Sequence, residues 1–355
     1  MDPFLSKLGI ELPIIQAPMA GVSTPEMAAA VSNAGGLGSI GIGAVDADGA
    51  GKMIAAVRSQ TDRAFQVNLF CHRPATADGA REAAWLNRLR PEFAHFGAKP
   101  PERLTEIYQT FLTDDAKLRL LLAERPAVVS FHFGLPGRDR IEALRKAGIK
   151  LLATATNLHE GKAAAAAGVD AVVAQGYEAG GHRGAFDVSA PDDRLGTIAL
   201  TRLLAHQLDV PVITAGGIMD GAGIAAALAL GAVAAQLGTA FIACPESSAD
   251  AGYRAALFSP AAEHTVMTAA ISGRPARCLA NRFTAFGSNI ESEAIPDYPI
   301  AYDAGKSLHA AAKIAGEFGY GAQWAGQGAP LARAAPAAEL VAALRREWEQ
   351  ATPAR

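Results

Sequence analysis

Residues 212–239 read VITAGGIMDGAGIAAALALGAVAAQLGT, and they contain one complete unit of the predicted fold. A β-branched apolar run at 212–215 ends in two glycines, and an alanine-rich segment at about 221–230 is typical of a buried helix. Gly231 provides a turn, after which a second apolar run at about 233–238 is short enough for a buried strand. This stretch therefore predicts two parallel strands joined by a helix.

The same alternation extends outward through much of the chain. Short β-branched apolar runs end in Gly, Asn, His or Gln and are followed by alanine-rich helical segments. Continuous apolar strands are typical of a parallel sheet that is buried on both faces. We count eight such runs, the number that closes a parallel barrel, and the predicted fold class is an α/β TIM (β/α)8 barrel. The runs are 13–17, 37–40, 65–69, 128–133, 150–155, 171–175, 212–215 and 234–238.

Two stretches are longer than a minimal barrel needs, and we expect them to form an added, mainly helical substrate or lid domain. One separates the third and fourth runs, and the other follows the eighth. The predicted division is a barrel at 1–69 and 126–245, a helical insertion at 70–125, a substrate or lid region at 246–335 that returns to the barrel, and a C-terminal helix at 336–355.

Composition excludes several classes of protein. The net charge of −3 over 355 residues gives no electrostatic reason to expect a nucleic acid or an anionic membrane surface as a partner. Residues 221–245 carry no charge, but Gln236, Gly238 and Thr239 favour helix, turn and strand over a membrane span. Three widely spaced cysteines form neither a disulfide framework nor a metal site. We therefore expect no metal. The N-terminus lacks the pattern of a signal peptide, and together with the cysteine usage this leads us to expect a cytoplasmic protein.

The carboxyl ends of the strands of a barrel form its active site, so the residues there carry the functional prediction. Ala215-Gly216-Gly217 and Gln236-Leu237-Gly238-Thr239 place glycines after the last two strands, where backbone N–H groups can converge on a phosphate. Thr239 could complete this cradle, and a helix that begins near Asp220 or Gly221 could add its dipole. The alternative is that these glycines only form tight turns.

Two further features indicate chemistry at the same end of the barrel. The turn Gly180-Gly181-His182 can pass close to a flat ligand and leave an imidazole above it for proton transfer. The alternatives are that His182 is an exposed loop residue and that His132 is a hydrogen-bonded core histidine. Tyr298, Tyr302 and Lys306 are spaced by four and would share one helix face that could bind an anion, although an ordinary surface helix has the same spacing.

Four of these motifs resemble the FMN-dependent nitronate monooxygenases, formerly called 2-nitropropane dioxygenases, over about Leu5 to Lys306. The motifs are QAPMAGV at 16–22, GGHRG at 180–184, AGGI at 215–218 and QLGTA at 236–240. His132, His182, Tyr298, Tyr302 and Lys306 narrow the resemblance to the bacterial class I enzymes.

The resemblance implies a TIM barrel that binds FMN non-covalently, with an added substrate domain. His182 matches the proposed catalytic base, and His132, Tyr298, Tyr302 and Lys306 match residues that line the substrate pocket. The implied reaction is the oxidation of alkyl nitronates, notably propionate 3-nitronate, by O2 to a carbonyl compound plus nitrite and nitrate, a detoxification. The residues implied to contact the flavin are Met19, Asn68, Gln175, Gly180, Gly217, Gln236, Leu237, Gly238 and Thr239.

Two other functions are compatible with the same motifs. An NAD(P)H-dependent flavin reductase acting on quinones or enoyl thioesters would use the same barrel and the same Gly-Gly-His turn. A phosphate-binding or nucleotide-binding sensor would use the glycine-rich loops without turnover, but barrels overwhelmingly host enzymes. The partners we expect are a small-molecule nitronate and O2, and the chain is expected to be a monomer or a small homo-oligomer.

Overall fold

The computed structural model of the protein describes residues 2–352, so residue 1 and residues 353–355 of the predicted division lie outside the described residues. Eight parallel strands form the predicted barrel, in the hydrogen-bonded order β1-β9-β8-β6-β5-β4-β3-β2. A parallel bridge between Ile15 and Leu37 joins the two end strands and closes the sheet. The strands are β1 (Ile14–Gln16), β2 (Gly38–Gly41), β3 (Phe65–Phe70), β4 (Val128–His132), β5 (Lys150–Ala155), β6 (Ala171–Gln175), β8 (Val212–Ala215) and β9 (Ala234–Leu237).

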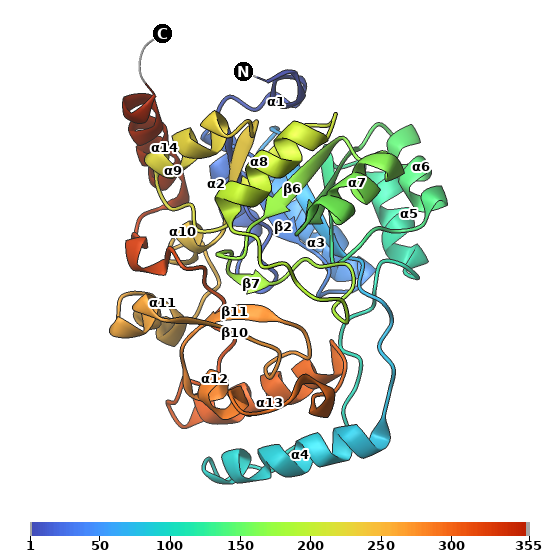
Figure 1. Ribbon diagram of the computed structural model, residues 1–355, viewed down its shortest axis with the longest axis vertical. Coiled ribbons are helices and arrows are strands. Elements are labelled where there is room, and N and C mark those ends of the chain that lie inside the picture. Colours follow the sequence, from blue (N-terminus) through green and yellow to red (C-terminus); the bar gives the residue numbers. More distant parts are fainter. Residues whose placement is uncertain (1, 353–355) are drawn as a thin grey trace.

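All eight predicted runs are confirmed as strands, to within one residue at either end. Helices follow the strands and cover the barrel from outside (Figure 1). Side-chain caps begin two of these helices: the Thr24 hydroxyl accepts from the Met27 N–H at 3.1 Å, and Asn157 Oδ1 accepts from the Glu160 N–H at 2.9 Å. The helices of the barrel are α1 (Pro3–Lys7), α2 (Pro25–Asn33), α3 (Ala47–Arg58), α5 (Asp115–Glu124), α6 (Arg138–Lys146), α7 (Leu158–Ala167), α8 (Thr197–Gln207), α9 (Gly221–Ala229), α10 (Thr239–Ile242) and α14 (Ala337–Ala351).

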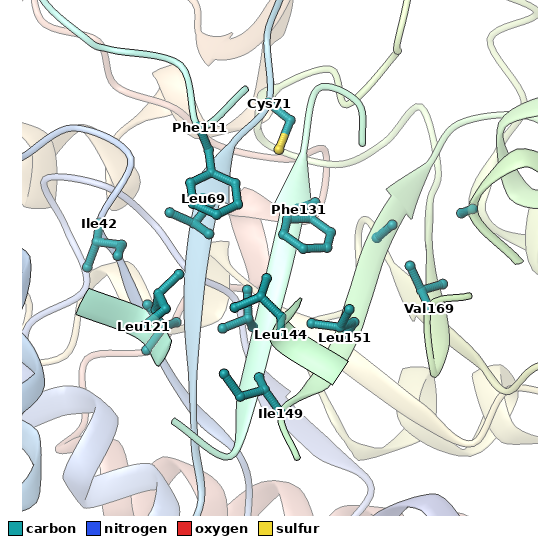
Figure 2. Close-up of a cluster of buried hydrophobic side chains, with 14 of the residues drawn as sticks. Ile42, Leu69, Cys71, Phe111, Leu121, Phe131, Leu144, Ile149, Leu151 and Val169 are labelled. Atoms are coloured by element: carbon teal, nitrogen blue, oxygen red, sulfur yellow. The ribbon is translucent and has the colours of Figure 1, made fainter. Parts of the chain in front are cut away.

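The alternation of side chains along each strand decides which residues reach the inside of the barrel. Outward-facing residues such as Leu69, Phe131 and Leu151 pack against Leu121 and Leu144 of the surrounding helices (Figure 2). Inward-facing residues at the amino ends of the strands fill the barrel with a second apolar cluster. The polar residues at the carboxyl ends therefore point inward above this apolar floor: Gln66, Asn68, Ser130, His132, Thr154, Gln175 and Gln236.

Residues from the two predicted long stretches lie together at one end of the barrel (Figure 1). Trp85 and Phe93 of α4 (Gly79–Ala94) share a hydrophobic cluster with residues such as Phe283 and Leu308 of the later stretch. The helical elements of that later stretch are α11 (Ala251–Leu257), η1 (Pro260–Glu263), α12 (Arg282–Gly287), η2 (Ser292–Ala294), α13 (Ile300–Ile314) and η3 (Ala329–Leu331).

The same region contains a small antiparallel sheet that the sequence patterns did not predict. The hairpin of β10 (Thr265–Thr268) and β11 (Ala276–Leu279) pairs with β7 (Gly181–His182), with Ala276 opposite His182. Residues 265–268 and 276–279 lack the pattern that identified the barrel strands, an apolar run followed by an alanine-rich helical segment. The sheet connects the Gly-Gly-His turn directly to the later stretch of the chain.

The uncharged segment at 221–245 forms α9, β9 and α10. Within residues 2–352, we find no helix that combines the length and the apolar character needed to cross a bilayer. Within the segment 336–355, α14 spans Ala337–Ala351 and packs on α9 and α2 of the barrel.

Candidate active site

A cavity of about 740 Å³ opens at the carboxyl ends of the barrel strands, where the sequence places the functional residues. Its wall combines strand-end residues with residues of α13 and of the segment 321–324. Leu237 does not line the cavity, because the strand alternation turns its side chain outward into a cluster with Ile14 and Phe241. The predicted residues that do line it are Met19, Asn68, His132, Gln175, Gly180, His182, Gly217, Gln236, Gly238, Thr239, Tyr298, Tyr302 and Lys306.

Backbone exposed by glycines forms one part of this wall. Gly216 and Gly217 adopt φ values of 127° and 70°, which side-chain-bearing residues rarely adopt. A Cβ on Gly238 would lie next to Ala17 and Met19, both of which line the cavity. Thr239, the first residue of α10, accepts from the Gly326 N–H at 3.0 Å through its hydroxyl oxygen. The glycines of the predicted phosphate cradle and Thr239 therefore lie together at the cavity.

The sequence predicts that the dipole of the helix beginning near Asp220 or Gly221 contributes to phosphate binding, and this prediction is wrong. The helix α9 does begin at Gly221, but two of its first three N–H groups have carboxylate partners within the protein. Asp220 Oδ1 accepts from the Gly223 N–H at 2.8 Å, and Glu347 Oε2 of α14 accepts from the Gly221 N–H at 3.0 Å. The dipole of α9 is therefore compensated by carboxylates, and α10 is the helix that starts at the cavity.

Amide side chains form the inner wall. Asn68 Nδ2 donates to Ser130 Oγ at 2.9 Å, and Gln66 Nε2 donates to the same oxygen at 3.0 Å. The Oε1 atoms of Gln66 and Gln236 are buried and accept no hydrogen bond from residues 2–352. Buried amide oxygens are costly to leave unpaired, so these two atoms are candidates for accepting from a bound polar group.

The Gly-Gly-His turn is held by two of the predicted site residues. The Gln175 amide donates to the His182 carbonyl at 3.0 Å and accepts from the Gly184 N–H at 2.7 Å. His132 Nε2 lies 3.2 Å from the same carbonyl, and its Nδ1 lies 3.0 Å from Thr154 Oγ1. Both nitrogens of His132 are therefore engaged within the protein, as in the alternative of a hydrogen-bonded core histidine. Burial lowers the pKa of His132 to about 4, so its ring is neutral.

His182 is neither an exposed loop residue nor a member of the apolar core. Its ring lies among aromatic rings, with centroid distances of 5.3 Å to Tyr298, 5.0 Å to Trp324 and 5.6 Å to Phe133. Burial and the positive charge of Arg274 hold the pKa of His182 well below its ordinary value. The ring is therefore a neutral imidazole that lines the cavity and can accept a proton.

The predicted anion-binding set also reaches the cavity. Tyr302 and Lys306 lie on α13, whereas Tyr298 precedes the helix and is buried with no hydrogen-bond partner for its hydroxyl among residues 2–352. Lys306 Nζ lies 4.9 Å from the ring centroid of Tyr108 and 5.4 Å from that of Tyr302. Burial lowers the pKa of Lys306 and the charge of Asp303 opposes this shift, but no carboxylate in the described chain forms an ion pair with the ammonium group.

Sequence reasoning missed several residues of this site, most of which lie away from the strand ends in the chain. Tyr108, Phe133 and Trp324 supply rings to the wall. The guanidinium carbon of Arg274 lies 4.2 Å from the centroid of the Phe133 ring. Only Phe133, which directly follows β4, could have been found by examining strand ends.

The wall residues fit FMN. The glycine cradle at 216–217 and 238–239 exposes backbone to a phosphate, and the unpaired oxygens of Gln66 and Gln236 could accept from a polar ring edge. Within residues 2–352, no three His, Cys, Asp or Glu side chains gather closely enough to hold a metal ion.

Comparison with known proteins agrees with this geometry. The sequence profile of the family described as "Nitronate monooxygenase" matches residues 2–347. A nitronate monooxygenase of Paraburkholderia phytofirmans is 66% identical over 346 residues, which cover 98% of this chain and 94% of that protein. A nitronate monooxygenase of Pseudomonas aeruginosa is 57% identical over 343 residues, covering 97% of this chain and 98% of the relative.

Solved structures show the same arrangement of the chain. A nitroalkane oxidase from Streptomyces ansochromogenes superposes with a TM-score of 0.88 at 42% identity and covers 98% of both chains. FabK from Thermotoga maritima superposes with a TM-score of 0.74 at 29% identity, covering 99% of this chain and 97% of that one.

Proposed function

The chain belongs to the nitronate monooxygenase family, and from this premise we propose that it oxidises alkyl nitronates with O2, using FMN bound at the strand ends. The proposed products are a carbonyl compound with nitrite and nitrate. One nitronate and one O2 balance to one carbonyl and one nitrate, whereas two nitronates and one O2 balance to two carbonyls and two nitrites. The observation that carries the proposal is the convergence of His182, Tyr298 and Lys306 on the cavity that the glycine cradle borders.

We assign the FMN phosphate to the backbone of Gly217, Gly238 and Thr239, and the polar edge of its ring to the amides of Asn68 and Gln236. Gln175 retains one amide hydrogen and one lone pair beyond its contacts with the Gly-Gly-His turn. The chemistry that FMN supplies when bound is electron acceptance from the substrate and electron transfer to O2. We place the reaction in the cytoplasm, since Cys71, Cys244 and Cys278 are all free thiols.

The substrate class follows from the charges on the wall. A nitronate is an anion, and propionate 3-nitronate also carries a carboxylate. The unpaired ammonium of Lys306 is suited to the carboxylate, and the buried Tyr298 hydroxyl can donate to an oxygen of the nitronate group. Aromatic rings around the Tyr298 hydroxyl exclude water, which strengthens its interaction, whereas Lys306 stays partly open to water.

The imidazole of His182 extends the reaction to neutral nitroalkanes. A neutral nitroalkane must lose a proton from the carbon next to nitrogen before it becomes a nitronate. Because the pKa of His182 is held low, the ring is unprotonated at neutral pH and is available as the acceptor. A preformed nitronate does not require this step.

The proposal is tested by mixing the purified protein, without oxygen, with ethylnitronate and separately with NADH. Reduction of the flavin absorbance by ethylnitronate but not by NADH is the expected result. Rapid bleaching by NADH alone would instead identify a flavin reductase acting on quinones or enoyl thioesters. A protein purified without flavin that turns over neither compound would contradict both enzymes.

The variant His182→Asn separates the two substrate classes. It should retain FMN and lose about a hundredfold or more in kcat/KM with nitroethane, since general-base catalysis contributes roughly 10²–10⁴ in rate. With preformed ethylnitronate the loss should stay within about threefold, since no proton is removed. Steady-state oxygen consumption with each substrate measures the difference, and equal losses would refute the role of His182 as base.

A further inference from the structure

The hairpin β10–β11 brings a serine to the ring of His182. Ser272 lies in the loop between these strands and is fully buried. Its hydroxyl oxygen lies 2.9 Å from His182 Nε2, and the same hydroxyl donates to the carbonyl oxygen of Arg274 at 3.2 Å. The loop is fixed to the turn on the other side of His182, where the Arg183 N–H donates to the Pro275 carbonyl at 2.8 Å.

These two contacts can both be hydrogen bonds at the same time with only one placement of the protons. A serine hydroxyl has a single hydrogen, and a carbonyl oxygen can only accept. When the hydroxyl of Ser272 donates to Arg274, its oxygen can interact with His182 only as an acceptor. His182 Nε2 must then be the protonated nitrogen, and the lone pair of the neutral ring lies on Nδ1.

We propose that Ser272 is a positioning residue that fixes the Nε2-protonated form of His182, so that Nδ1 is the atom that removes the substrate proton. The inference rests on the proposed role of His182 as base. Nδ1 makes no hydrogen bond to residues 2–352 and is not sealed off from the cavity that His182 lines. In the proton transfer, the C–H bond next to the nitro group breaks, an N–H bond forms at Nδ1, and the electron pair stays on the nitronate.

The opposite form of the ring would be unproductive. With the proton on Nδ1, the lone pair on Nε2 would point at Ser272 and away from the cavity. Water cannot readily replace Ser272, since Phe133, Tyr298 and Trp324 surround the ring. The backbone of His182 is held independently, because its carbonyl accepts from Gln175 and His132. Ser272 therefore acts on the ring and not on the position of the turn.

The test compares Ser272→Ala and Ser272→Thr with the matched control Ser32→Ala, all as flavin-loaded protein. Ser32 is another fully buried serine whose hydroxyl donates to a carbonyl, that of Ala64 at 2.8 Å, and it does not line the cavity. Two-bond ¹H–¹⁵N correlation spectra of ¹⁵N-histidine-labelled protein report which ring nitrogen is protonated. His182→Asn identifies the signals of His182.

Wild-type protein and Ser32→Ala should show His182 protonated on Nε2, and Ser272→Ala should show the Nδ1-protonated form as well. The kcat/KM of Ser272→Ala with nitroethane should fall about fivefold, the value of one hydrogen bond of average strength, and stay within about twofold with ethylnitronate. Both substrates need the same folded enzyme, so the ratio of the two kcat/KM values is insensitive to partial loss of protein. Ser272→Thr keeps the hydroxyl and should restore this ratio to the wild-type value if the variant folds.

A wild-type spectrum with His182 protonated on Nδ1 would overturn the proposal, and so would a Ser272→Ala spectrum and substrate ratio equal to those of Ser32→Ala. Failure of the proposed function gives a different result. In that case His182→Asn lowers kcat/KM equally for nitroethane and for ethylnitronate, even though the wild-type ring is protonated on Nε2.

Discussion

Lys306 places an ammonium group between two aromatic rings at the cavity, with no carboxylate of the described chain paired to it. The faces of aromatic rings stabilise a cation without neutralising its charge. The charge therefore stays available for an anionic group of the substrate. The other lysine of α13 that lines the cavity, Lys313, differs in this respect, because its Nζ lies 2.8 Å from Asp250 Oδ2.

The substitution Lys306→Met tests whether this charge selects the substrate. The KM for propionate 3-nitronate should rise about tenfold, while the KM for ethylnitronate stays within about twofold. A tenfold rise is at the lower end of what the loss of a charge-assisted hydrogen bond costs, because Lys306 is partly open to water. Lys313→Met is the control and should leave the ratio of the two KM values unchanged. A Lys306→Met enzyme with the wild-type ratio would remove Lys306 from the substrate site.

At the residue scale, the sequence predicted those side chains whose position follows from a strand end. Asn68, His132 and Gln175 line the cavity because each lies at or near the carboxyl end of a barrel strand and points inward. Ser272 could not be predicted in this way. It reaches His182 through the pairing of β7 with β11, in which residues almost a hundred positions apart along the chain are neighbours.

At the scale of elements, the turn between β9 and α10 shows how the chain gives a ligand access to backbone. Gly238 is the residue before α10, and its φ of −108° does not require glycine. An added Cβ would meet Ala17 and Met19 at 3.4 Å and 3.6 Å, which are ordinary contacts. The conformation and the neighbouring protein atoms therefore both tolerate a side chain, so a requirement for glycine at this position would have to come from the proposed FMN phosphate.

Gly238→Ala should accordingly weaken FMN binding by about tenfold or more and change the midpoint of thermal unfolding of the flavin-free protein by only about 2 °C or less. Fluorescence titration of the flavin-free protein with FMN measures the affinity. Gly51→Ala, within α3 and away from the cavity, is the matched control and should leave FMN affinity unchanged. Unchanged affinity in Gly238→Ala would place the phosphate elsewhere.

The elements themselves were predictable because each barrel strand and its helix carry local signals. Apolar runs, Gly turns and the caps at Thr24 and Asn157 all lie within a few residues of the structure they specify. The error at α9 has a tertiary cause, since the carboxylate of Glu347 in α14 binds the N-terminus of that helix from more than a hundred residues away. The short strands β7, β10 and β11 were missed because no alanine-rich helical segment follows them, which was the local signal of the barrel strands.

At the scale of the whole molecule, folding encloses several histidines as neutral rings around one buried guanidinium. His72 and His132 both have their pKa lowered to about 4, chiefly by burial, and the charge of Arg274 contributes in each case. Their ordinary pKa is 6.5. Between these two pKa values, the unfolded chain binds protons that the folded protein does not. The free energy of unfolding therefore decreases as the pH falls through this range.

When the pH is lowered from about 7.5 to about 5, each of these two histidines should therefore reduce the free energy of unfolding by about 2 kcal/mol. Above about pH 7.5 the free energy of unfolding should change little. Denaturant titrations at the two pH values, at equal FMN occupancy, measure the loss. His72→Leu should reduce the pH-dependent loss by about 2 kcal/mol, because one titrating group is removed. His206→Leu, at an exposed position on α8, should leave it unchanged. A His72→Leu protein with the wild-type pH dependence would show that His72 is already protonated in the folded chain.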